Sequence, residues 1–69
     1  MKTYAVIIEP TETGFSAYVP DLPGCIAVGH TIDETRDCMR ISIQLHLEML
    51  RELGEPIPDP SSRVLDLTA

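Results

Sequence analysis

The sequence contains no tryptophan, one phenylalanine and only two tyrosines among its 69 residues. Basic residues are also scarce, since five Lys and Arg stand against eleven Asp and Glu, and the net charge is −6. A protein that binds a nucleic acid backbone needs basic side chains to displace condensed counterions, so this balance argues against direct nucleic acid binding. The same charge balance argues against binding to an anionic membrane surface, whereas it allows binding to a basic protein partner.

Long apolar runs are missing as well. The chain has no stretch of about 18 apolar residues that could cross a bilayer, and no apolar segment typical of a signal peptide. Two cysteines, Cys25 and Cys38, are too few for the disulfide framework of a small secreted domain. We therefore expect a cytoplasmic protein with a single domain over residues 1–69, which is small enough to be only marginally stable as a lone monomer.

Three segments in the first half of the chain have the composition of β-strands. Residues 3–9 are rich in β-branched and aromatic side chains, and residues 15–19 alternate apolar and polar positions after a short turn. A turn at Pro23 and Gly24 then leads into a third short strand over residues 25–29. The sequence therefore predicts a three-stranded antiparallel meander.

A long helix is predicted after the third strand. Thr31 suits the N-cap, and Glu34 completes a capping box with it. The helix is expected to run to Leu53, because Gly54 suits the left-handed position after a helix and Pro56 cannot continue one. After a proline-rich connector, residues 63–67 are predicted to form a final short strand at an edge. The order β-β-β-α-β predicts an α+β fold.

The predicted helix is apolar over an arc roughly twice the 100° that packing on one sheet requires. One stripe is expected to cover the sheet, and an adjoining stripe needs another cover. That cover is either the final strand or connector, or a second subunit, and the small size of the chain favours a homodimer or higher oligomer. The first stripe consists of Ile32, Met39, Ile43, Leu47, Leu50 and Leu53, and the second of Cys38, Ile41, Leu45 and Met49.

The cysteines and histidines do not match a metal site or a cysteine hydrolase. Cys25, His30, Cys38 and His46 lack the close pairs of ligands that zinc sites use. A cysteine nucleophile needs a histidine close in space, whereas Cys25 and His30 point to opposite faces if their strand is regular. We therefore expect no metal and no cofactor.

The acidic residues do not match a metal-dependent nuclease either. Asp33 and Glu34 have a sufficient structural role at the helix N-terminus, where negative charge meets the helix dipole. Glu9, Glu12 and Asp21 lie near hairpin ends, and no set of three acids occupies matching strand positions. We therefore expect a protein that is not an enzyme.

Two separated motifs resemble the HicB-like antitoxin family. The first is a PDLPGC loop, followed by Gly29-His30-Thr31, and the second is the exit from the helix, G-E-P-I-P-D-P-S at residues 54–61. His46-Leu47-Glu48 matches an H-L-E of the family's helix, and Thr35 stands where many members have alanine. The likeness covers residues 3–61. The loop motif consists of Pro20, Asp21, Leu22, Pro23, Gly24 and Cys25.

The resemblance implies a partial RNase H-like fold, homo-oligomers, and a small HicA-type toxin, an mRNA interferase, as the partner. It implies that the domain neutralises this toxin by covering its RNA-cleaving site. Because an acidic antitoxin suits a basic RNA-binding toxin, Glu9, Glu12 and Asp21 are candidate partner-binding residues. Full-length members often carry a C-terminal DNA-binding domain, for which this chain has no room, so we expect a short single-domain member.

Two alternatives stay open. One is an oligomeric interaction module without a toxin partner, and the other is a vestigial hydrolase of the RNase H type, which would need clustered carboxylates.

Overall fold

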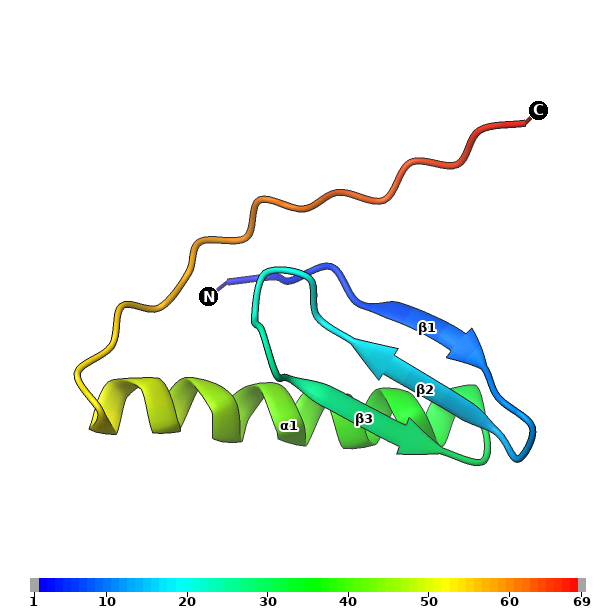
Figure 1. Ribbon diagram of the computed structural model, residues 1–69, viewed down its shortest axis with the longest axis horizontal. Helices are drawn as coiled ribbons and strands as arrows, with labels where there is room; N and C mark the ends of the chain where they lie inside the picture. The colour runs from blue at the N-terminus through cyan, green and yellow to red at the C-terminus, as the bar shows by residue number, and fades with distance from the viewer. Residues whose placement is uncertain (1, 69) are drawn as a thin grey trace.

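The computed structural model describes residues 2–68, so the two terminal residues of the predicted 1–69 domain lie outside it. Three strands are followed by one helix: β1 (Ile7–Pro10), β2 (Phe15–Tyr18), β3 (Ile26–Gly29) and α1 (Ile32–Glu52). The strands form one antiparallel sheet in the order β1-β2-β3, and α1 lies across one face of it (Figure 1). The predicted α+β fold, with a three-stranded meander and one long helix, is confirmed.

The first strand is shorter than the sequence predicts. Ile7 faces Tyr18 at one end of the β1–β2 ladder, and Pro10 faces Phe15 at the other. Residues before Ile7 would have to pair with residues after Tyr18, where Pro20 lacks the N–H that a ladder requires and the chain turns away. Residues 3–6 therefore have no strand to pair with, although their composition is that of a strand.

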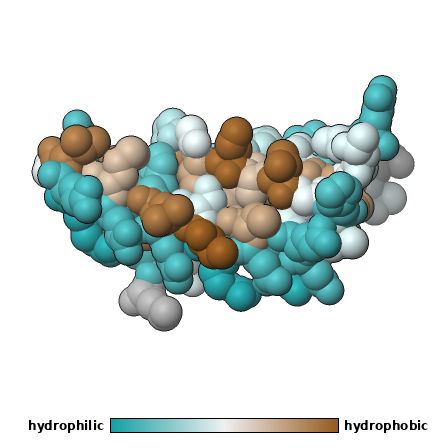
Figure 2. Space-filling model, turned by 90° about the horizontal axis from the view of Figure 1, so that it is seen from below, coloured by the Kyte–Doolittle hydropathy of each residue, from teal (hydrophilic) through white to brown (hydrophobic). Residues whose placement is uncertain are grey.

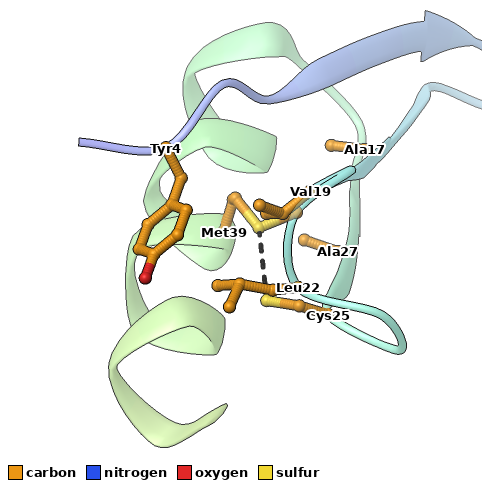
Figure 3. Close-up of a cluster of buried hydrophobic side chains, with 7 residues drawn as sticks. All are labelled: Tyr4, Ala17, Val19, Leu22, Cys25, Ala27 and Met39. Carbon is orange, nitrogen blue, oxygen red and sulfur yellow. Dashed lines mark hydrogen bonds between the residues drawn. The ribbon is translucent and has the colours of Figure 1, made fainter. Parts of the chain in front are cut away.

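The core lies between the middle of α1, the inner face of the sheet and the loop that joins β2 to β3. Ala17 of β2 faces Ala27 of β3, and these small side chains let the helix approach the sheet closely. Val6, Ile43 and Leu47 pack around the buried cluster and are partly buried themselves. Figure 3 shows the seven buried apolar side chains, which are Tyr4, Ala17, Val19, Leu22, Cys25, Ala27 and Met39.

Both ends of α1 follow the predicted capping chemistry. The Thr31 side chain accepts a hydrogen bond from the Glu34 amide at 3.1 Å, while the Glu34 carboxylate accepts one from the His30 amide at 2.9 Å. Thr35 is fully buried in the first turn, and its hydroxyl donates to the Thr31 carbonyl at 2.8 Å. At the other end, Gly54 adopts a φ of 69°, as predicted.

No helix within residues 2–68 is long and apolar enough to span a bilayer.

The prediction of a final strand over residues 63–67 is wrong for the described chain. Residues 55–68 run as an extended tail on the β1 side of the sheet, away from β3 (Figure 1). The side chains of Val64, Leu65 and Leu67 are 66%, 77% and 83% exposed. Apolar alternation is not enough to make a strand, because a strand also needs an edge with which to pair. The tail therefore leaves the second apolar stripe of α1 uncovered.

Candidate functional site

The loop between β2 and β3 is held in place by its own backbone. The amide of Leu22 donates to the Val19 carbonyl at 3.1 Å, the amide of Cys25 donates to the Leu22 carbonyl at 3.0 Å, and the amide of Val19 donates to the Cys25 carbonyl at 3.2 Å. The Leu22 side chain is fully buried in the core. These bonds and the buried Leu22 side chain hold the loop against the core, with Asp21 outside the buried cluster.

Gly24 has a φ of 85° in this loop, a conformation that β-branched residues avoid. Because a Cβ at this position would meet no heavy atom within 4 Å, backbone strain alone should decide the effect of a substitution. We expect Gly24→Val to lower the free energy of unfolding by about 1–3 kcal/mol. Chemical denaturation measures this value, with Gly24→Asn as a milder comparison, because asparagine tolerates a left-handed backbone better. Equal stabilities of the two variants would contradict the role of strain.

Asp21 attaches the tail to the rest of the molecule. Its carboxylate accepts hydrogen bonds from the amides of Ser61 and Ser62, both at 3.0 Å, and from their hydroxyls at 3.1 and 2.8 Å. These bonds, with the Ser62 amide contributing most, lower the pKa of Asp21 from 3.8 to about 2. Nearby, the Tyr4 hydroxyl donates to the Pro58 carbonyl at 2.6 Å, and Lys2 forms an ion pair with Asp59. Asp21 therefore has a structural role.

Protonation of Asp21 should release the tail at low pH. Because the pKa of this carboxyl is lower in the folded state than its usual 3.8, its stabilising effect is complete above pH 3.8 and is lost as the pH falls through about 2. We expect the Ser61 and Ser62 amides to lose their protection from hydrogen exchange in this window. Asp21→Asn should weaken that protection at every pH and remove its pH dependence. A tail that stays protected in the variant would show that other contacts hold it.

The three acidic candidates do not form one cluster. Glu9 lies at the end of β1 and Glu12 lies in the β1–β2 turn, and both are exposed. Asp21 lies in the β2–β3 loop at the opposite end of the sheet (Figure 1). Glu9 and Glu12 can therefore meet one partner together, whereas the Asp21 carboxylate is already engaged by the tail.

A groove that the sequence did not indicate lies beside Glu12. Its walls come from the β1–β2 turn, the end of β3 and the first turns of α1, and they include Thr11, Thr13 and Phe15. Glu34 and Asp37 contribute two further carboxylates to the wall. Sequence spacing could not reveal this groove, because Thr11 and Asp37 line the same groove only when the hairpin turn packs beside the first turns of the helix.

The cysteines and histidines stay apart. Cys25 is buried, and its thiol lies 4.0 Å from the Met39 sulfur (dashed in Figure 3) and 3.7 Å from the Ser42 hydroxyl. Cys38 is exposed, and the largely exposed His30 ring contacts Glu34 at 3.6 Å. Across residues 2–68, no group of three or more His, Cys, Asp or Glu side chains is placed to hold a metal ion.

The second stripe of α1 is exposed, as expected if the tail does not cover it. Ile26 and Val28 of β3 are exposed next to it, and the Ser42 hydroxyl links helix and strand by donating to the Ile26 carbonyl at 3.0 Å. Figure 2 looks onto this side and shows apolar side chains gathered along β3 and α1 between hydrophilic margins. We call this surface the α1–β3 patch; it consists of Ile26, Val28, Cys38, Ile41, Leu45 and Met49.

The strand half of this patch was not predicted from the sequence. Cys25 and Ala27 are buried, and Ile26 and Val28 alternate with them along the strand. That alternation was a usable signal, because a strand covered on one side only must leave every second side chain exposed.

A family model described as the HicB-like antitoxin of bacterial toxin–antitoxin systems matches residues 4–68. The chain belongs to the HicB-like antitoxin family. In this HicB-like domain, the two motifs that carried the resemblance contact each other, because Asp21 of the loop binds Ser61 of the exit motif. The loop motif and the exit motif therefore also bind the β2–β3 loop to the tail.

Several proteins are similar to this HicB-like domain. An uncharacterized 14.9 kDa protein of Haemophilus phage HP1 is 34% identical over 55 residues, which cover 80% of this chain but only 41% of the phage protein. A UPF0150 protein of Synechocystis is 34% identical over 62 residues, covering 88% of this chain and 85% of that protein. A UPF0150 protein of Archaeoglobus fulgidus is 33% identical over 53 residues, covering 75% and 77%.

The fold also matches a solved structure. A chain from a HicA3 and HicB3 toxin–antitoxin complex superposes with a TM-score of 0.76 and 32% sequence identity. The match covers 87% of this chain and 70% of that chain. The HicB-like fold is therefore supported both by sequence and by structure.

Proposed function

We propose that this HicB-like domain is an antitoxin that neutralises a small, basic HicA-type toxin by covering its RNA-cleaving site. The observation that carries the proposal is the likeness, at 32% identity, to a chain from a HicA3 and HicB3 toxin–antitoxin complex. The family match over residues 4–68 supports the same role. Covering a site requires binding and no chemistry, so the proposal assigns no catalytic residue to this chain.

The distribution of charge supports a basic partner. Residues 3–35 contain no lysine or arginine, whereas they contain Glu9, Glu12, Asp21, Asp33 and Glu34. All three strands and the first turn of α1 lie within this stretch, so no Lys or Arg side chain comes from the sheet, and Arg36 pairs only with Asp33 at 2.9 Å. A surface of one sign attracts a partner of the opposite sign and raises the rate of encounter.

We place the acidic contact at the hairpin end of the sheet. Glu9 and Glu12 are exposed there, and Glu34 and Asp37 line the neighbouring groove. Glu34 also accepts a hydrogen bond from the His30 amide and Asp37 lies 3.7 Å from Arg40, so Glu9 and Glu12 are the carboxylates that we assign to the Lys and Arg side chains of an RNA-binding site. Asp21 is the weakest of the three original candidates, because its carboxylate already accepts four hydrogen bonds from the tail.

The association rate with the toxin tests this placement. The gene for this chain is co-expressed with its neighbouring gene. If the product of that gene is a short basic protein that co-purifies, the complex is separated and association is followed across a salt series. We expect the double variant Glu9→Lys/Glu12→Lys to associate several-fold more slowly than the wild type, with a shallower salt dependence.

The matched control is Glu52→Lys/Glu55→Lys, which changes the net charge equally at the far end of α1. If both double variants slow association to the same extent, net charge matters and the hairpin end does not. An association rate that responds to neither salt nor charge reversal would contradict the electrostatic part. Failure of the adjacent basic protein to bind would favour an interaction module without a toxin partner.

A further inference from the structure

We infer that the groove beside the β1–β2 turn receives one arginine side chain of the basic partner, with the hydrocarbon stem of the arginine on Phe15 and its guanidinium at the Asp37 carboxylate. Asp37 is then a partner-binding residue in addition to Glu9 and Glu12, which do not line the groove. The inference rests on the proposed function, because it names the chemistry by which this groove recognises the partner.

The walls of the groove are packed together through their backbones. The β1–β2 turn, the end of β3 and the start of α1 meet at one end of the sheet (Figure 1). A Cβ on Gly14 would collide with the Gly29 carbonyl oxygen, and a Cβ on Gly29 would lie 2.6 Å from the Thr35 hydroxyl oxygen. Because the three walls approach so closely, none of them can shift alone, and the groove is formed before a partner arrives.

The lining of the groove is partly apolar and partly acidic. Phe15 is half-buried in β2, and Val28 and Cys38, which also belong to the α1–β3 patch, extend the apolar part. Glu34 and Asp37 of α1 supply two carboxylates, and no lysine or arginine of residues 2–68 belongs to the lining. The groove has a volume of about 670 Å³, which is the size of a small-ligand site and leaves room for a long side chain.

This lining suits a cation on a hydrocarbon stem. An anionic occupant would be repelled by the two carboxylates, and a wholly apolar occupant would remove them from water without giving them a partner. Lysine and arginine both have an apolar stem and a charged head. The planar guanidinium of arginine also stacks on aromatic rings and binds a carboxylate through two parallel hydrogen bonds, which an ammonium group does not do. An arginine therefore matches both Phe15 and Asp37.

Asp37 is the carboxylate of the groove that can change its partner. The Glu34 carboxylate accepts the His30 amide at 2.9 Å as part of the helix cap, so it has a structural role. The contact of Asp37 with Arg40 is 3.7 Å long, which is longer than a hydrogen bond, and both side chains are 66% exposed. An exposed pair of this kind stabilises a protein little, so an arginine of the partner can replace Arg40 at small cost.

A peptide probe tests the groove without the toxin. The probe is a blocked pentapeptide with one central arginine, and its control has citrulline there, which keeps the shape of arginine without the charge. Nuclear magnetic resonance of the full ¹⁵N-labelled chain should show the Phe15 and Asp37 amide signals shifting with the arginine peptide and saturating at millimolar concentration. The citrulline peptide should leave both signals unchanged. Equal shifts with the two peptides, or none with either, would overturn the inference.

A pair of matched variants tests the role of Asp37. Asp37→Asn should raise the Kd of the arginine peptide roughly tenfold, the effect of losing a charge-assisted hydrogen bond. The control is Asp33→Asn, which removes the same charge from the same end of α1. Asp33 also pairs with an arginine three residues on, Arg36, but it does not line the groove. Its variant should change the Kd by less than about twofold, because screening weakens charges outside the site. Equal effects of the two variants would show that only net charge matters.

The same two variants separate this inference from the proposed function. With a basic protein encoded by the neighbouring gene, Asp37→Asn should dissociate roughly tenfold faster, because a contact inside the groove breaks only after docking. If that protein binds and dissociates alike from Asp37→Asn and Asp33→Asn, the toxin role stands and the inference about the groove is wrong. If the arginine peptide binds in the groove but no neighbouring product binds the chain, the preference for arginine stands and the toxin role fails.

Discussion

Replacing Leu22 by alanine is expected to lower the free energy of unfolding by about 2–5 kcal/mol, the usual cost of truncating a buried leucine. Leu22 is fully buried, and only seven apolar residues form the buried core of the described chain. A 69-residue domain has a total stability of roughly 3–10 kcal/mol. The Leu22→Ala variant should therefore lose a large part of its free energy of unfolding, although Leu22 lies in a loop.

Urea denaturation of Leu22→Ala and Leu65→Ala at one protein concentration measures the difference. Leu65 is 77% exposed, so its truncation should change stability by less than about 0.5 kcal/mol. Identical transitions for the two variants would mean that the core does not depend on the β2–β3 loop.

The features that the sequence predicted well are those that depend on neighbouring residues. Thr31 and Glu34 cap α1 through bonds to amides within four residues, and Gly24 and Gly54 take the positive φ that their turns require. Each of these signals is local, so the sequence around it contains the necessary information. The bounds of α1 accordingly agree with the prediction to within one residue at its end.

The first apolar stripe was only partly predicted. Met39 is buried and Ile43 and Leu47 are partly buried, whereas Ile32 and Leu53 are 52% and 67% exposed. The cause is length: α1 has 21 residues and is about 32 Å long, whereas each four-residue strand extends about 13 Å. Periodicity specifies which side of a helix is apolar, but not how far along the helix the sheet reaches.

Contacts between distant residues could not be predicted from the sequence. The bonds from Ser61 and Ser62 to Asp21 span 40 and 41 residues. Nothing beside Asp21 signals that its carboxylate is occupied, and so it ranked equally with Glu9 and Glu12 as a partner-binding candidate. Residues 63–67 failed as a strand for a related reason, because the presence of a free edge is a property of the folded sheet and not of the segment.

Gly14→Ala should also destabilise the domain strongly, for a steric reason that the turn propensity of glycine does not predict. A Cβ on Gly14 would collide with the Gly29 carbonyl oxygen and would lie 2.8 Å from the His30 Cα, so both obstacles are backbone atoms. The β1–β2 turn would have to move away from the junction of β3 and α1, which strains the 2.8 Å hydrogen bond from the Thr11 amide to the Gly14 carbonyl.

We expect Gly14→Ala to lower the free energy of unfolding by about 1–3 kcal/mol, the cost of inserting a methyl group where there is no space. Thr13→Ala is the control, because it removes an exposed side chain from the same turn. The same displacement would reshape the groove lined by Thr11, Glu34 and Asp37. Gly14→Ala should therefore slow association with the proposed toxin beyond its effect on the folded fraction. If both variants denature alike, the hairpin turn has room to move, and the groove is not fixed by this contact.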